Sequence, residues 1–198
     1  MRHLLGVVFC GLLTAGIASA ADQNTAPAAG WGVEALMANL HQIRSASAHF
    51  VELKTIHMLT RPIRAEGTLS YVAPDRLEKI TTAPALETIR LDGQTLTGTR
   101  SNGDDYTVDI AGHSEIAAMV EGIRSTLAGD LPTLQRYYTI AFSGAPEHWQ
   151  MDLAPKDRRV REKVDRIRIA GAGTVIDTIA VDEKDGDRSE MTITPDRP

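Results

Sequence analysis

The spacing of hydrophobic positions changes near residue 45. Between Trp31 and Arg44 apolar residues recur every three or four positions, which predicts an amphipathic helix. From Ile63 to Tyr71 apolar and polar residues alternate strictly, and this pattern is typical of a strand with one wet face. The apolar face of that strand carries Ile63, Ala65, Gly67, Leu69 and Tyr71, whereas Arg64 and Glu66 are expected to face solvent.

Short strands separated by turn signals make up most of the remaining chain. The dipeptides Asp92-Gly93, Asn102-Gly103 and Asp185-Gly186 are typical of tight hairpin turns. Such turns join neighbouring antiparallel strands, so the first half of the chain is predicted to form an antiparallel meander. The expected strands are 48–59, 63–71, 77–82, 85–91, 95–100, 106–110, 137–143, 148–153, 163–170, 175–181 and 189–194.

A second helical spacing interrupts the strands between Gly112 and Gly129. His113-Ser114 is expected to cap its start and Gly129 to end it, while Leu131 and Leu134 continue the apolar face in a short further turn. The connections are too short for parallel crossovers. We therefore expect an α+β, mainly β fold, in which two amphipathic helices cover one large curved antiparallel sheet of about 11 strands. A two-sheet sandwich is the alternative.

The N-terminus has the pattern of a cleaved signal peptide. Arg2 precedes an apolar run from Leu4 to Ile17, and Ala18 to Ala20 are small residues suited to cleavage. The run is shorter than the about 20 residues that a membrane span needs. We expect a cleaved signal peptide at residues 1–20 and a periplasmic location.

The rest of the composition indicates one domain without thiol chemistry. Residues 21–30 are polar and rich in alanine, which predicts a flexible segment, and residues 31–198 suffice for a single domain. Cys10 is the one cysteine, and it would leave with the signal peptide. The formal net charge of −5 argues against nucleic acid as a partner.

Motifs for catalysis or metal binding are absent from the sequence. His49 and His57 would stand about 26 Å apart on one strand, too far to share a metal. Gly171 to Gly173 lacks the Lys-Ser/Thr that completes a phosphate loop. Asp104-Asp105 and Asp182-Glu183 adjoin turns, where acidic residues are common. We expect no catalytic residue, no metal site and no cofactor, and hence a protein that is not an enzyme.

Several short segments resemble the LolA family of periplasmic outer-membrane lipoprotein carriers, and they do so in the family's order and spacing. Together they cover nearly the whole chain after the signal peptide. Residues 50–63 resemble a divergent branch of that family. The segments are the early helix with Leu36, Leu40 and Ile43, then Ser45 to Phe50, Gly67 to Pro74, Arg76-Leu77, Pro84, Asp92-Gly93, Leu153 to Lys156 and Val181 to Gly186.

The resemblance implies an open half-barrel whose helices act as a lid over an apolar cavity. It also implies a monomeric carrier of acylated cargo, with a donor at the inner membrane and an acceptor at the outer membrane. One position departs from the family, because the arginine before the Pro74 equivalent, which is tied to lid closure, is Ala73 here. Arg61, Arg64 and Arg76 are the nearest residues that could replace it.

The apolar faces of the sheet and of the two helices indicate where cargo would bind. If the helices cover the sheet incompletely, the gap is an apolar site. Methionines suit such a site because they adapt to irregular ligands, which adds Met58 to the candidates. The expected cavity residues are Leu36, Met37, Leu40, Phe50, Ile63, Leu69, Tyr71, Met119, Val120 and Ile123.

Two functions follow from these observations. The first is a periplasmic carrier that binds acyl chains and shuttles lipoproteins or a lipid-like molecule between the inner and outer membrane. The alternative is a periplasmic protein- or peptide-interaction module that binds its partner in a β-rich groove.

Overall fold

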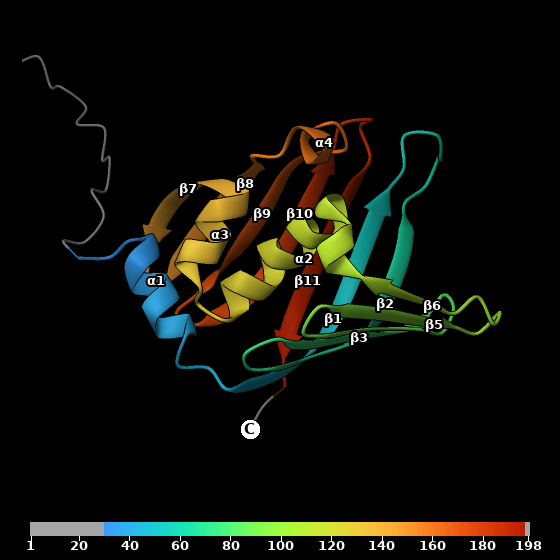
Figure 1. Ribbon diagram of the computed structural model, residues 1–198, viewed down its shortest axis with the longest axis horizontal. Helices are drawn as coiled ribbons and strands as arrows, with labels where there is room; N and C mark the ends of the chain where they lie inside the picture. Colours follow the sequence, from blue (N-terminus) through green and yellow to red (C-terminus); the bar gives the residue numbers. More distant parts are fainter. Residues whose placement is uncertain (1–29, 197–198) are drawn as a thin grey trace, which may run out of the picture.

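The computed structural model describes residues 30–196, and its strands form a single antiparallel sheet (Figure 1). The expected signal peptide, and the segment 21–30 apart from Gly30, lie outside the described residues. The strands are β1 (Ser45–Thr55), β2 (Ile63–Val72), β3 (Arg76–Ala83), β4 (Glu87–Asp92), β5 (Thr95–Arg100), β6 (Tyr106–Asp109), β7 (Tyr138–Ala145), β8 (His148–Pro155), β9 (Val164–Ala172), β10 (Val175–Glu183) and β11 (Arg188–Pro195).

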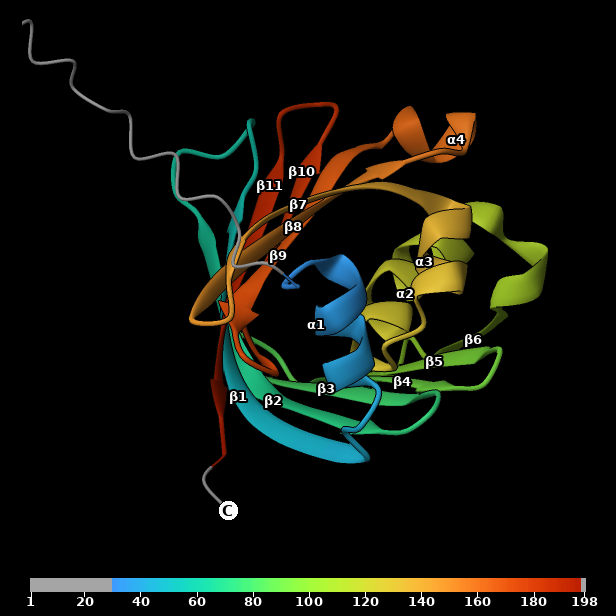
Figure 2. The same ribbon diagram turned by 90° about the vertical axis from the view of Figure 1, so that its left-hand side faces the viewer.

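The strand order is β6-β5-β4-β3-β2-β1-β11-β10-β9-β8-β7. Two meanders therefore meet where β1 pairs with β11, with Phe50 opposite Ile193. The sheet is strongly curved and does not close into a barrel, so β6 and β7 remain its edges (Figure 2). The expected curved antiparallel sheet is confirmed, and the sandwich alternative is wrong because all eleven strands share one sheet.

Three helices lie inside the curve of the sheet (Figure 2). They are α1 (Val33–Leu40), α2 (Ser114–Leu127) and α3 (Leu131–Tyr137), and α4 (Arg158–Arg161) connects β8 to β9. The two expected helices are present, and the short turn at Leu131 is a helix of its own. Asp130 caps α3, since its side chain accepts a hydrogen bond of 3.0 Å from the backbone N–H of Thr133.

The expected cap of α2 is wrong in its detail. His113 occupies the N-cap position, but no side chain caps the helix there. The side chain of Asp109 instead caps the preceding 3-10 turn, η1 (Ile110–Gly112), at the N–H of Ala111. The expected end of α2 agrees with the structure, because Gly129 follows it with a φ of +66° that favours glycine.

The two halves of the curved sheet are packed unequally. The main core lies over β7 to β10, where α1 and α3 pack against the sheet. A much smaller cluster of Leu91, Ile110 and Ala117 lies between α2 and the first meander. The main core is built on the large buried side chains Leu36, Met37, Leu40, Leu134, Tyr138, Trp149, Met151, Leu153, Ile167 and Ile169.

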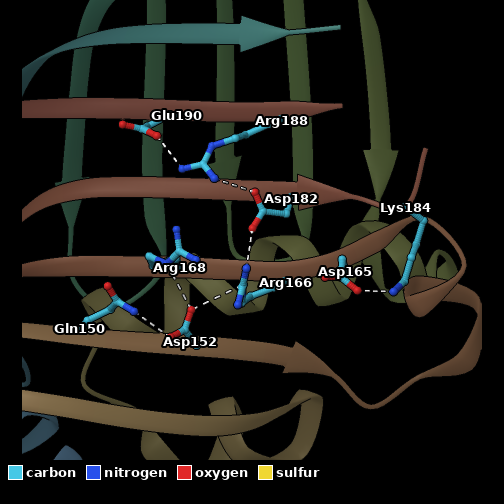
Figure 3. A network of polar contacts seen from close by, with 9 residues as sticks. All are labelled: Gln150, Asp152, Asp165, Arg166, Arg168, Asp182, Lys184, Arg188 and Glu190. Atoms are coloured by element: carbon cyan, nitrogen blue, oxygen red, sulfur yellow. Dashed lines mark hydrogen bonds and ion pairs between the residues drawn. The ribbon is translucent and has the colours of Figure 1, made fainter. Parts of the chain in front are cut away.

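The outer face of the second meander carries charged pairs that cross from strand to strand (Figure 3). Arg166 donates to Asp182 at 3.0 Å, and Arg188 donates to the other oxygen of Asp182 at 3.2 Å. Arg166 and Arg168 alternate along β9 with the buried Ile167 and Ile169. Partly exposed pairs of this kind add little stability. Their consequence is that the outer face stays wet, so the helices pack on the inner face.

Candidate functional site

An apolar cavity of about 790 Å³ lies between α1, α2 and the middle of the sheet. Its volume falls in the range of roughly 300–1,000 Å³ that is usual for small-molecule sites. Its helical side is formed by Leu40 of α1, by Val120, Ile123 and Leu127 of α2, and by Ile43 in the connection after α1. Its sheet side is formed by Ala46, Ala48, Leu69, Tyr71, Leu77, Ile89, Leu91, Leu96, Val175, Ile176, Ile179, Met191 and Ile193.

Small side chains on β1 explain why this part of the sheet is not filled. Ala46 pairs with Tyr71 on β2, and Ala48 pairs with Leu69, so each pair puts one short side chain on the inner face. In the second meander, inner pairs such as Met151 opposite Ile169 and Leu153 opposite Ile167 are large on both sides. The cavity therefore lies over the alanines of β1, whereas the corresponding space over these pairs is filled.

Five of the ten expected residues lie in the cavity wall. The structure brings Leu69 and Tyr71 together on neighbouring inner-face positions of β2, as their alternation indicated. The other three come from the helices, and they are Leu40, Val120 and Ile123.

Three further expected residues are buried away from the cavity. Leu36 and Met37 are 0% and 2% exposed, because α1 packs its first turns into the main core. Phe50 is 2% exposed and lies against Gly67, where an added Cβ would stand 3.0 Å from its ring. These side chains support the fold around the cavity.

The structure does not bring Ile63, Met119 or Met58 to the cavity. Ile63 begins β2 at the end remote from α1 and is 40% exposed. Met119 is 44% exposed, because it points away from the sheet while its neighbour Val120 points toward it. Met58 is 79% exposed in the loop after β1.

One lysine lies on the inner face beside the apolar wall. Lys79 pairs in the sheet with Leu69 on one side and Ile89 on the other, and all three line the cavity. Its ammonium donates to Oε2 of Glu52 at 2.5 Å and stands 4.9 Å from the centre of the Phe50 ring. No sequence pattern indicates this contact, because the two partners are 27 residues apart.

Glu52 is held from two sides. The hydroxyl of Ser189 on β11 donates to its Oε1, and Lys79 donates to its Oε2. Burial alone would raise the pKa of Glu52. The hydrogen bonds from Lys79 and Ser189 and the charges of Lys79 and Lys54 outweigh burial, so the pKa lies below its ordinary value.

Tyr71 brings a second polar group to the wall. It is 3% exposed, and its hydroxyl has no hydrogen-bond partner among the described residues. Burial, together with the charge of Asp75, raises the pKa of this phenol against the opposing charge of Arg44. The phenol is therefore neutral at physiological pH.

A partly buried arginine joins α2 to the first meander. Arg124 forms an ion pair with Glu121 one turn earlier, and its Nη1 donates to the backbone carbonyl of Gly93 in the β4–β5 turn at 2.5 Å. Arg64 and Arg76, which were considered as replacements for the family arginine, pair with Glu66 and with Asp92 on the sheet. Among the described arginines, Arg124 makes the helix-to-sheet contact.

Within residues 30–196 one group of side chains is close enough together to hold a metal ion. It consists of His57, Asp185 and Asp187, at the loop after β1 and the β10–β11 turn. Nδ1 of His57 lies 2.8 Å from Asp187 Oδ1, and the His57 backbone N–H also donates to that oxygen, which lowers the pKa of Asp187. These contacts explain why the three side chains lie together, since they join the loop after β1 to the β10–β11 turn.

None of the helices in residues 30–196 combines the length and the apolar character that a membrane crossing requires.

Comparison with known families matches residues 25–194 to the family model described as "Outer membrane lipoprotein carrier protein LolA-like". A comparison with curated protein sequences gives no match. The match to the family model spans most of the chain.

Solved structures with low sequence identity also align with most of this chain. The LolA superfamily protein NE2245 from Nitrosomonas europaea is 10% identical, with a TM-score of 0.45 over 85% of this chain and 96% of its own. A DUF1329 family protein from Desulfovibrio piger is 8% identical, with a TM-score of 0.45 over 82% and 88%. LprF from Mycobacterium bovis is 12% identical, with a TM-score of 0.30 over 84% and 93%.

Proposed function

Since the chain belongs to the LolA-like family of outer-membrane lipoprotein carrier proteins, we propose that it is a periplasmic carrier that binds acyl chains in its apolar cavity. In this role it takes a lipoprotein or lipid-like molecule from a donor at the inner membrane and delivers it to an acceptor at the outer membrane. The observation that carries the proposal is the unfilled apolar cavity of about 790 Å³ in a sheet whose other half is densely packed.

The energetics of acyl binding suit a carrier. Burial of one methylene contributes about 0.8 kcal/mol, so an acyl chain of about 16 carbons gains roughly 10 kcal/mol before costs. Ordering the chain and displacing the cover offset much of this gain. The cargo is then held across an aqueous gap and can still be released.

The contacts of the helices indicate which part of the cover moves. The first turns of α1 are fixed in the main core through Leu36 and Met37. α2 contacts the first meander through the small cluster around Ile110 and through the hydrogen bond from Arg124 to Gly93. We therefore propose that α2 shifts relative to the first meander when cargo enters or leaves.

A titration with a fluorescent fatty acid tests acyl binding. Leu69→Asp puts a carboxylate into the apolar cavity wall and should weaken binding at least about tenfold, since an acyl chain packed against this carboxylate would strip it of water. Thr68→Asp is the matched control, because Thr68 is the preceding residue of β2 and faces outward. Equal binding by both variants would place the acyl chain elsewhere. Equal affinity for acylated and unacylated peptides would favour the interaction module.

Carriage between membranes needs a separate assay. Protein loaded with a radiolabelled acylated peptide is placed between donor and acceptor vesicles that cannot touch. We expect transfer that increases with protein concentration. Binding without transfer would restrict the proposal to a lipid-binding protein.

A further inference from the structure

The single charged side chain on the inner face of the described cavity wall is that of Lys79. Glu78 and Asp196 also contribute to the wall, but they lie on outer-face positions, where they pair with Arg90 and His49. Lys79 follows Glu78 in β3 and therefore points to the inner face, where it lies between the apolar Leu69 and Ile89. A cargo molecule in this cavity therefore meets one ammonium group, which is paired with Glu52 beside the wall, and the neutral hydroxyl of Tyr71, whereas the other inner-face strand residues of the wall are apolar.

The fold holds this ammonium in a fixed place. β2 lies between β1 and β3, and its inner-face residues at this level, Ala65 and Gly67, have no long side chain. Lys79 can thus reach across β2 to Glu52, passing over the Phe50 ring at 4.9 Å. Its side chain is 27% exposed and that of Glu52 is 17% exposed, so the pair is partly removed from water.

The ammonium has donors left for a ligand. It carries three N–H groups, and among the described residues it donates to Glu52 alone. Both oxygens of Glu52 are already engaged, by Lys79 and by Ser189. An ion pair at an apolar wall stabilises a fold no better than apolar packing does, so stability gives little reason for a lysine here.

We propose that Lys79 binds the headgroup of the cargo, and that this cargo is an acyl chain ending in a free carboxylate. The inference rests on the proposed function, because it assumes that the acyl chain lies in the cavity. A carboxylate carries one negative charge, so a single charge-assisted hydrogen bond can hold it, even from an ammonium that Glu52 already partly neutralises. A phosphate carries more charge and would need further cations, whereas the other charged residues of the wall, Glu78 and Asp196, are acids.

Three amphiphiles with the same alkyl chain length test the headgroup. Laurate, dodecanol and dodecyl phosphate compete for the cavity against a bound fluorescent probe. Wild-type protein should bind laurate about tenfold or more tightly than dodecanol, since a hydrogen bond to a charged group has that effect. Lys79→Met should remove this preference and leave the affinity for dodecanol unchanged.

Two further variants keep the test decisive if Lys79→Met folds poorly. Lys79→Arg keeps the charge and should keep the preference for laurate. Glu52→Gln removes the competing carboxylate and should raise the affinity for laurate several-fold. Lys163→Met is the matched control, because Lys163 pairs with Glu115 in an exposed contact outside the cavity wall and should behave as wild type.

The outcomes separate this inference from the proposed function. Equal affinities for laurate and dodecanol in wild type and in Lys79→Met would overturn the headgroup site and leave acyl binding intact. Tighter binding of dodecyl phosphate than of laurate would overturn the assignment of a carboxylate. A wild-type protein that binds none of the three would contradict the proposed function itself.

Discussion

The guanidinium of Arg124 on α2 donates a hydrogen bond of 2.5 Å to the backbone carbonyl of Gly93, in the turn between β4 and β5. The same side chain pairs with Glu121, which is 6% exposed and also accepts a hydrogen bond of 3.0 Å from Ser125. One side chain therefore neutralises a buried carboxylate and holds the helical cover to the sheet.

Replacing Arg124 by methionine should destabilise the protein by about 3 kcal/mol, because Glu121 is left buried without its partner. Urea unfolding measures the loss. The double variant Glu121→Gln/Arg124→Met removes both charges and should recover much of that stability while leaving α2 untied. Faster amide exchange of α2 in the double variant would support the tie to Gly93, and exchange at the wild-type rate would argue against it.

Two buried tyrosines should respond differently to removal of their hydroxyls. The Tyr138 hydroxyl donates to the carbonyl of Ala118 on α2 at 2.8 Å, so Tyr138→Phe should cost about 1 kcal/mol of unfolding free energy. The Tyr71 hydroxyl has no partner among the described residues, so Tyr71→Phe should be neutral or stabilising. The two variants serve as controls for each other in thermal unfolding. A larger loss for Tyr71→Phe would show that its hydroxyl is bonded in solution.

The stability of the protein should depend on the ionisation of Glu52. Its pKa in the folded protein is lower than its ordinary value of 4.5, so the pair with Lys79 stabilises the fold fully above that value. The contribution is lost as the pH falls through 4.5 toward the folded pKa. Unfolding free energies measured from neutral pH to about pH 3 should fall less steeply for Glu52→Gln than for wild type. Glu147→Gln, at an exposed turn, should follow the wild-type profile.

Filling the cavity should weaken binding of long chains without harming the fold. Ala48→Phe adds a ring where β1 leaves space opposite Leu69. Each methylene that no longer fits costs about 0.8 kcal/mol, or about a fourfold change in affinity. Titrations with fatty acids of increasing length should therefore reach their maximum affinity at a shorter chain in this variant. Ala141→Phe, on the exposed outer face of β7, should leave the length dependence unchanged.

The sequence could predict the sheet well because strand alternation and turns are local. The alternation around Leu69 and Tyr71 correctly indicated which residues share the inner face. The hairpin turns at Gly93 and Gly186 likewise fixed the order of neighbouring strands.

The position of the cavity depends on which part of the sheet each helix covers, and helical spacing does not contain that information. Leu36 and Leu40 belong to one apolar stripe, yet Leu36 packs in the main core and Leu40 reaches the cavity. Met119 and Val120 are neighbours in an apolar segment, yet only Val120 lines the cavity.

Small side chains that leave space, and contacts between residues far apart in the sequence, were also not predicted, because both depend on the fold. Ala48 contributes to the cavity by being small, and a pattern search for apolar side chains gives it no weight. Arg124 binds a backbone carbonyl 31 residues away, and no sequence motif marks such an acceptor. Register across the sheet, which places Lys79 near Glu52, is a property of the fold.

Acyl carriage is tested by mass spectrometry of organic extracts from protein purified without detergent. We expect a bound molecule with an acyl chain in wild-type protein and in Thr68→Asp, and its loss from Leu69→Asp. An empty wild-type protein that also fails to bind added fatty acids would contradict the claim that the cavity carries acyl chains.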